Sequence, residues 1–428
     1  MTPYHKPMEP RHAPHTPQKP AVKRPYLLLA GLLIAVLAML AGGAVLFMNK
    51  AAGPGPSRPM SEFLGQGPWH TNGSQILDAN NQPVRIAGVN WFGFETETFV
   101  VHGLHSRGYQ DMLNQIRNAG YNTIRLPYSN QLFDNNSKPN SIDYSKNADL
   151  RGLQGLQLMD KIIGYASSIG LHIILDQHRP AANAQSSLWY TDAYPEKRWI
   201  ADWQMLAQHY KDNLYIIGAD LHNEPHQPAC WGCGQQNLDW QQAATRAGNA
   251  ILALNPNWLI FVEGVDCISG QGQQGNGDCY WAGGNLKGVR EHPVQLNLSG
   301  RLVYSVHDYP ASVYKQSWFA AANYPQNLSQ VWDSHWGYIQ KNGIAPVWVG
   351  EFGTRLRTDK DKQWFASLVR YLGTGASGFS WTFWSWNPNS QDTGGILQDD
   401  WLTIDQAKQL QLQTIQFPLG GHNLAAVT

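Results

Sequence analysis

The chain has 428 residues, with 31 basic and 31 acidic side chains, so its formal net charge at pH 7 is zero. This balance excludes a nucleic-acid partner, because binding a phosphate backbone requires a basic field. The chain also contains 18 Trp and 18 Tyr. Tryptophan is costly at a surface unless it packs against or binds something flat, such as a pyranose ring.

The first 25 residues form a basic, proline-rich segment without an apolar run. Their five Lys and Arg side chains face a single acid, Glu9. Such a composition cannot build a core, because it has too little apolar surface to bury. We therefore expect residues 1–25 to be a disordered tail, and the segment that follows predicts that this tail is cytoplasmic.

Residues 26–48 form an uncharged, apolar run. As a helix these 23 residues would extend about 34 Å, which is enough to span a bilayer. Lys23 and Arg24 at its leading end predict that this end stays in the cytoplasm. The length favours an uncleaved signal-anchor, and a cleaved signal peptide is the alternative. Both interpretations place the rest of the chain outside the cytoplasm, membrane-anchored or secreted, with residues 49–60 as a linker.

Residues 61–420 alternate between apolar, strand-like runs and helix-like stretches. The predicted strands are Val84–Val89, Thr123–Leu126, His172–Leu175, Tyr215–Leu221, Leu259–Val262, Leu302–Val306, Pro346–Val349 and Phe379–Phe383. The predicted helices include Leu153–Ile169, Arg198–Tyr210, Trp240–Leu254, Leu328–Gln340 and Lys362–Leu372. Almost wholly apolar strands separated by helices indicate a parallel sheet covered by helices.

Eight such units are the number that closes a TIM barrel. The expected fold class is therefore α/β, a (β/α)8 TIM barrel in one domain over residues 61–420. The turns at Asn72-Gly73 and Asn80-Asn81 predict a hairpin at Trp69–Pro83 that leads into the first strand. Residues 421–428 would be a C-terminal tail, and we expect a monomer.

Polar or aromatic side chains follow almost every predicted strand. They are Asn90-Trp91, Arg125, Asp176-Gln177-His178-Arg179, Asn223-Glu224, Glu263, His307-Asp308-Tyr309, Glu351 and Trp381–Trp386. Because barrel enzymes build their active sites at the carboxyl ends of the strands, these side chains should share one rim. Two carboxylates facing one pocket are what glycosidic-bond cleavage requires, and Glu224 and Glu351 are placed to supply them.

All four cysteines lie in the part of the chain that is expected to be exported, where disulfides form. Cys230-Trp231-Gly232-Cys233 could be a redox pair, half of a zinc site or a structural clip. A zinc site needs a second pair at similar spacing, but Cys267 and Cys279 lie farther apart. The spacing favours two structural disulfides, Cys230–Cys233 and Cys267–Cys279.

Several stretches resemble glycoside hydrolase family 5. They are Asn90–Thr96 (NWFGFET), Leu221–His226 (LHNEPH), Gly350-Glu351-Phe352 and Trp381–Pro388 (WTFWSWNP). The resemblance is especially to the catalytic domains of actinobacterial-type endo-β-1,4-glucanases, and it covers essentially residues 61–420. It implies retaining hydrolysis of internal β-1,4-glucosidic bonds in a β-glucan by double displacement, without a metal or another cofactor.

The resemblance implies that Glu224 is the general acid/base and Glu351 the nucleophile. The nucleophile must stay ionised, so it needs a cation and a hydroxyl group nearby. Arg125 and Tyr309 are the candidates for these two roles. Glu263 has no role implied by the resemblance, and we interpret it as structural or supporting.

The resemblance also implies a set of sugar contacts. Asn223 would hold the 2-hydroxyl of the sugar at the cleaved bond, in a contact that strengthens in the transition state. His178 and His307 would complete the polar floor, with His307 near the acid/base. Trp384 would stack under the same sugar, and Trp91 would be a further platform.

Structural interpretations remain open for three of these residues. Arg125 could be an ion-pair residue that closes the barrel, and His178 could be a structural histidine. Trp384 lies in an aromatic cluster, so a neighbour within residues 381–386 could be the platform in its place.

Three other functions compete with this hypothesis. His222 and His226 bracket Glu224 as in a zinc hydrolase, but that motif needs a helix, and Pro225 blocks one. A non-catalytic carbohydrate-binding barrel would not need both carboxylates. The same mechanism could act on mannan, xyloglucan, xylan or mixed-linkage glucan, because substrate choice depends on the loops.

Overall fold

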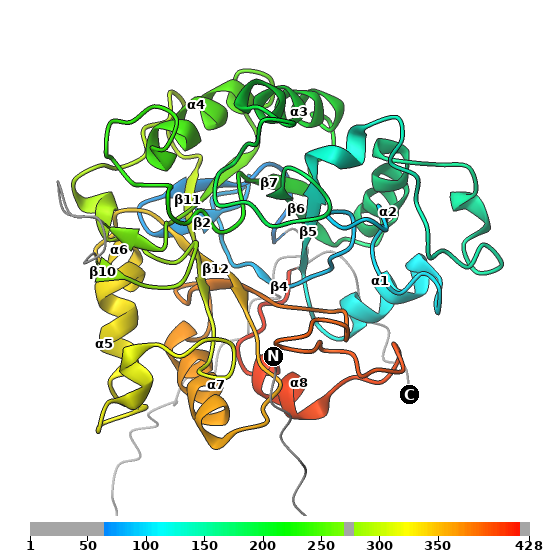
Figure 1. Cartoon of the computed structure of the whole chain (residues 1–428). Helices are drawn as coiled ribbons and strands as arrows, with labels where there is room; N and C mark the ends of the chain where they lie inside the picture. The colour runs from blue at the N-terminus through cyan, green and yellow to red at the C-terminus, as the bar shows by residue number, and fades with distance from the viewer. Residues whose placement is uncertain (1–63, 269–277, 420–428) are drawn as a thin grey trace, which may run out of the picture. The chain divides into compact units, whose positions relative to one another are not determined.

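Eight parallel strands form a closed barrel in the computed structural model, which describes residues 64–268 and 278–419. The order around the barrel is β11-β12-β13-β4-β5-β6-β7-β8, with helices outside it (Figure 1). The strands are β4 (Ala87–Asn90), β5 (Thr123–Ser129), β6 (His172–Arg179), β7 (Ile216–Asp220), β8 (Leu259–Glu263), β11 (Leu302–Asp308), β12 (Val347–Phe352) and β13 (Ser380–Phe383). The predicted TIM barrel is confirmed.

The helices that connect these strands cover the outside of the barrel. They are α1 (Tyr109–Asn118), α2 (Leu156–Ser168), α3 (Glu196–His209), α4 (Trp240–Leu252), α5 (Leu328–Trp332), α6 (Tyr338–Lys341), α7 (Asp359–Leu372) and α8 (Gln406–Gln413). α8 is absent from the predicted helices, and the composition of α8 explains why. Two of its three buried side chains, Lys408 and Gln409, are polar, so no apolar period marks the helix.

The helix predicted at Leu328–Gln340 is divided in the structure. A π-helical turn at Asp333–Gly337 separates α5 from α6. The Tyr371 hydroxyl donates to Asp333 Oδ1 at 2.5 Å, and it fills the space that a Cβ at residue 337 would need. Packing against α7 therefore favours the wider turn, with glycine at its end.

The first predicted strand, Val84–Val89, is two strands in the structure. Val84 belongs to β3 (Pro83–Val84), which pairs antiparallel with β2 (Gln75–Leu77), and β2 pairs with β1 (His70–Asn72). The barrel strand β4 begins only at Ala87. An apolar run cannot distinguish one strand from two when both are buried, so the prediction merged them.

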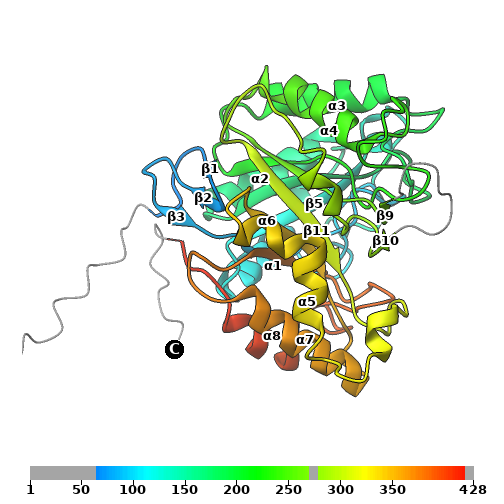
Figure 2. The same ribbon diagram turned by 90° about the vertical axis from the view of Figure 1, so that its left-hand side faces the viewer.

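The small β1–β3 sheet closes one end of the barrel. Figure 2 shows it at the end opposite to β9 (Cys267–Ile268) and β10 (Asp278–Cys279). Its apolar residues pack in one buried cluster with the barrel interior, made of Trp69, Ile76, Val84, Ile86, Ile174, Ile217, Leu259, Phe261, Val303 and Trp348. Apolar side chains therefore fill this end of the barrel interior among the described residues.

The predicted membrane span at residues 26–48 lies outside the described residues, as do the predicted tails and linker. Within residues 64–268 and 278–419, no helix combines the length and apolarity that crossing a membrane requires. The signal-anchor therefore stays a prediction from the sequence.

Candidate active site

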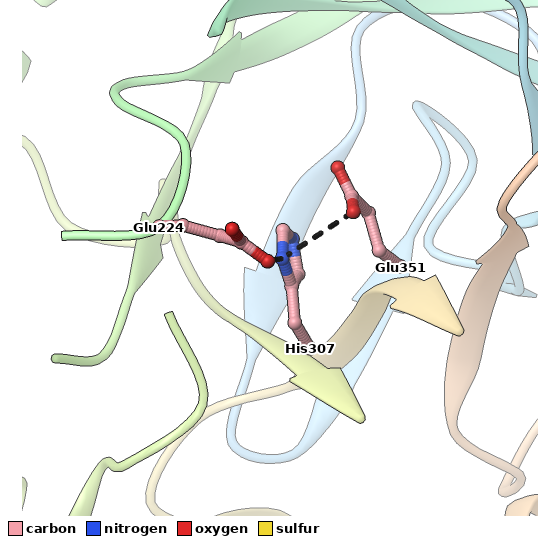
Figure 3. A group of neighbouring side chains, drawn as sticks. All are labelled: Glu224, His307 and Glu351. Atoms are coloured by element: carbon pink, nitrogen blue, oxygen red, sulfur yellow. Dashed lines mark hydrogen bonds and ion pairs between the residues drawn. The ribbon is translucent and has the colours of Figure 1, made fainter. Parts of the chain in front are cut away.

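Two glutamates face each other at the carboxyl end of the barrel. Glu351 lies in β12, and Glu224 lies four residues beyond β7, in left-handed backbone with φ of 54°. One oxygen from each carboxylate and one nitrogen of His307 all lie within 4.8 Å of one another (Figure 3). The Glu351 side chain is only 4% exposed, whereas that of Glu224 is 27% exposed. One carboxylate is thus enclosed, and the other meets solvent.

Arg125 occupies the centre of the barrel beneath this pair. Its guanidinium contacts four buried carboxylates, at 2.5 Å from Glu351, 2.8 Å from Asp220, 3.1 Å from Asp176 and 3.2 Å from Glu263. Burial alone lowers the pKa of Arg125, but the four carboxylates raise it well above its ordinary value. Arg125 is therefore a permanent cation that binds Glu351 directly and also ties several strands together.

Glu351 has two strong partners. Arg125 Nη1 donates to its Oε1 at 2.5 Å, and the Tyr309 hydroxyl donates to its Oε2 at 2.5 Å. Both bonds favour the ionised carboxylate. These are the cation and the hydroxyl group that the sequence analysis sought for a nucleophile.

His307, on β11, lies between the two glutamates. Its Nδ1 is 3.0 Å from Glu224 Oε1 and 3.6 Å from Glu351 Oε2, and its Nε2 is 3.2 Å from Glu263 Oε1. Burial lowers the pKa of His307, but Glu263, Glu351 and the hydrogen bonds raise it well above its ordinary value. Carboxylates on both sides of the ring therefore favour its protonated, imidazolium form.

Three further predicted residues border the same space. Asn223 Oδ1 accepts from Arg125 at 3.0 Å, which leaves the Asn223 amide NH2 without a hydrogen bond within the described residues. Asp176 accepts from His178 Nδ1 at 2.7 Å. The His178 ring lies 5.4 Å from that of Trp384 and nearly parallel to it. The side chains thus present a free amide donor and a partly exposed indole.

The structure corrects the prediction for Trp91. Its side chain is completely buried, and its Nε1 donates to the His102 carbonyl at 3.0 Å, so no face is open to a sugar. Trp381 and Trp386 are also completely buried. Trp384 is the partly exposed Trp of this group, whereas its neighbours Trp381 and Trp386 have no exposed face.

The comparisons with known proteins agree with this geometry. The cellulase family, glycosyl hydrolase family 5, matches residues 77–390. The chain belongs to this family. It is 54% identical over 357 residues to an endoglucanase of Paenibacillus polymyxa, covering 83% of this chain and 88% of that protein. It is 42% identical to the major extracellular endoglucanase of Xanthomonas campestris, covering 80% of this chain and 70% of that protein.

Solved structures of relatives have the same fold. The catalytic domain of the Xanthomonas campestris enzyme has a TM-score of 0.75 at 41% identity, covering 81% of this chain and 99% of that one. A variant endocellulase from Pyrococcus horikoshii, in complex with cellotetraose, has a TM-score of 0.75 at 40% identity, covering 82% and 98%.

This family 5 site includes buried groups that the sequence analysis left without a role. Asn90 accepts from Arg125 Nη1 at 3.1 Å, and Asp220 and Glu263 accept from the same guanidinium. Burial raises the pKa of both Asp220 and Glu263 to about 7. Only their position could have pointed to Asn90, Asp220 and Glu263 in the sequence, since each is the last residue of a barrel strand.

Glu224, His307 and Glu351 have the spacing of a metal-binding group. The zinc motif suggested by the two histidines around Glu224 is a separate arrangement. His222 and His226 do not converge on a shared point. His222 Nδ1 bonds Gln177 at 2.6 Å, and His226 Nδ1 bonds the Glu224 carbonyl at 2.7 Å.

Both disulfides expected from the cysteine spacing are present. Cys230 is bonded to Cys233, and Cys267 to Cys279. The second bond joins β9 to β10, which flank residues 269–277. The first lies in the segment that leads into α4, where the N-cap Asp239 accepts from Gly232 N at 3.0 Å and from Gly234 N at 2.7 Å.

Proposed function

We propose that this protein is a retaining endo-β-1,4-glucanase that cleaves internal bonds of a β-glucan by double displacement. The observation that carries the proposal is the close approach of the Glu224 and Glu351 oxygens, within 4.8 Å. Retaining glycosidases hold their carboxyl groups about 5–5.5 Å apart, whereas inverting enzymes need about 6.5–9.5 Å to admit a water molecule.

Glu351 acts as the nucleophile, because Arg125 and Tyr309 favour its carboxylate form. It attacks the anomeric carbon as the glycosidic C–O bond breaks, and Glu224 gives its proton to the departing oxygen. Glu224 then takes a proton from water, whose oxygen attacks the anomeric carbon and releases Glu351. The greater exposure of Glu224 suits this second step, since water must reach it.

The sugar at the cleaved bond meets two further groups. The free Asn223 amide can donate to its 2-hydroxyl, and this bond strengthens as positive charge develops on the ring. Trp384 offers a partly exposed indole for stacking under the same ring. Both contacts orient the anomeric carbon towards Glu351.

The substrate class rests on the relatives, which are named endoglucanases, and on an endocellulase solved with cellotetraose. Comparing kcat/KM on carboxymethylcellulose, barley glucan, mannan and xylan tests this choice. The β-1,4-glucans should be hydrolysed fastest. A preference for mannan or xylan would move the enzyme to another substrate while leaving its mechanism in place.

The stereochemistry gives the decisive test of mechanism. NMR of the first product formed should show the β configuration at the new reducing end, and Glu351→Gln should abolish turnover without loss of fold. Initial release of the α anomer, or full activity in Glu351→Gln, would refute the proposed mechanism.

A further inference from the structure

Glu263 ends β8, is fully buried, and contacts a partner of each of the two site glutamates. Its Oε1 lies 3.2 Å from Arg125 Nη2 and 3.2 Å from His307 Nε2. Arg125 binds the Glu351 carboxylate, and His307 binds that of Glu224. One carboxylate therefore bridges the group that supports the nucleophile and the group that supports the acid/base.

The other oxygen of Glu263 holds the main chain of Glu224. Its Oε2 accepts from the Glu224 N–H at 2.7 Å. Glu224 has a φ of 54°, a backbone conformation that is unfavourable for residues other than glycine and needs support from its surroundings. Gly283 packs on the same oxygen, since a Cβ there would collide with Oε2 and lie 3.4 Å from Glu224 Cα.

The charges that face Glu263 come from four strands. His307 on β11 and Arg125 on β5 are cationic, and Asp220 on β7 and Asp176 on β6 are acidic. His307 has a carboxylate on each side, Glu224 at Nδ1 and Glu263 at Nε2. The ring hydrogen-bonds Glu224 through Nδ1, and its Nε2 lies at ion-pair distance from Glu263, so both carboxylates favour the doubly protonated, cationic ring. Among the charges that raise the pKa of His307, Glu263 is the largest, and without it only Glu351 and Glu224 oppose the effect of burial.

We propose that Glu263 is a positioning residue for the acid/base, which fixes the Glu224 main chain and keeps His307 doubly protonated so that the imidazolium ion orients the Glu224 carboxyl group. The expected effect on turnover rests on the proposed function, because it requires Glu224 to be the acid/base. The protonation of His307 can be measured without any substrate.

Glu263→Gln tests the assignment, because it keeps the shape and removes the charge. Histidine ¹⁵N NMR, with the signal assigned by its loss in His307→Asn, should show His307 doubly protonated at pH 7 in the wild type and neutral in Glu263→Gln. We expect kcat on polymer to fall about tenfold or more, with a much smaller change in KM. The alkaline limb of the pH–rate profile, which reports loss of the Glu224 proton, should move to higher pH, because a neutral His307 no longer favours the ionised form of Glu224.

Asp308→Asn is the matched control. Asp308 lies next to His307, and burial raises its pKa to about 7 as well. Its carboxylate accepts from the Tyr280 hydroxyl, from Trp332 Nε1 at 3.0 Å and from Trp364 Nε1 at 2.6 Å. Within the part of the chain that the structure describes, no hydrogen bond or ion pair joins it to Glu224 or Glu351. Asp308→Asn should leave the His307 signal and the alkaline limb in place, whatever it does to the melting temperature.

A second variant keeps the proposal testable if Glu263→Gln does not fold. Gly283→Ala leaves the Glu263 charge in the protein but displaces its Oε2, so it should lower kcat without neutralising His307. An unchanged His307 signal in folded Glu263→Gln would overturn the proposal, and so would failure of both variants to fold. Inactivity of the wild type on every glucan would count against the proposed function instead.

Discussion

At the scale of single residues, the site depends on how buried charges are paired. Arg125 is completely buried among four carboxylates, and removing one partner of such a cluster leaves an uncompensated charge at a cost of several kcal/mol. Two of these acids also contact other residues of the proposed site, since Glu351 accepts from Tyr309 and Glu263 contacts His307. Stability and catalysis therefore depend on the same residues here.

Glu224→Ala should separate the two chemical steps. An activated aryl cellobioside needs no acid for its leaving group, so the enzyme should still be glycosylated and should release a burst of phenol. Hydrolysis of the polymer should be nearly abolished. Azide should restore turnover on the aryl substrate, because a small anion can replace the base-activated water. If azide gave no rescue, Glu224 would not be the acid/base.

Trp384→Ala should mainly lower activity, whereas Trp91→Ala should mainly lower stability. Loss of the partly exposed Trp384 should lower kcat/KM about tenfold with little change in stability, because one stacking contact is removed. Loss of the buried Trp91 should cost about 3–5 kcal/mol of unfolding free energy through the cavity it leaves. Kinetics and denaturant unfolding of both variants check this. Equal kinetic losses in two equally stable proteins would contradict the assignment.

At the scale of elements, each strand brings a reactive group to one rim, and the helices fix the loops around it. The start of α4 shows this, because it follows directly on the Cys230–Cys233 segment. Its N-cap Asp239 is buried and accepts from Gly232 N, from Gly234 N and from Gln242 N. One carboxylate thus caps the helix and also holds the segment that contains the disulfide.

Asp239→Ala should therefore cost more than the removal of an ordinary cap. We expect a loss of about 2 kcal/mol, the upper end for an N-cap, because two N–H groups of the preceding segment lose their acceptor as well. Asp405→Ala, at the less buried N-cap of α8, should cost about 1 kcal/mol or less. Urea unfolding compares the two. An equal or larger loss in Asp405→Ala would show that the extra bonds contribute nothing.

At the scale of the whole molecule, the barrel has two different ends. The end near the β1–β3 sheet is filled by an apolar cluster that includes Trp69 and Trp348, whereas the carboxyl end holds the charged network around Arg125. The Arg125 guanidinium lies 5.9 Å from the Trp348 ring, where the two regions meet. The proposed catalytic groups therefore lie above a buried apolar cluster.

The predicted signal-anchor determines where the entire chain should be found in the cell. The full-length protein should sediment with membranes, because residues 26–48 form an uncharged apolar run behind Lys23 and Arg24. A protein starting at Ser61 should remain in the supernatant with the same kcat on a soluble glucan. Recovering only a processed form that starts near residue 50 from the native host would favour the cleaved signal peptide.

The sequence by itself determined the barrel and the two glutamates. Eight apolar runs alternate with helices, which is sufficient to predict the barrel. The carboxyl ends of all barrel strands lie at the same rim, so position along the chain is sufficient to bring the two glutamates together. Trp91 and Trp384 both follow strand positions in aromatic surroundings, and only packing decided that the first is buried and the second partly exposed. Glu263 shows the same limit. Its contacts with Glu224, Arg125 and His307 join three barrel strands and the segment after β7, and no local sequence pattern records such contacts.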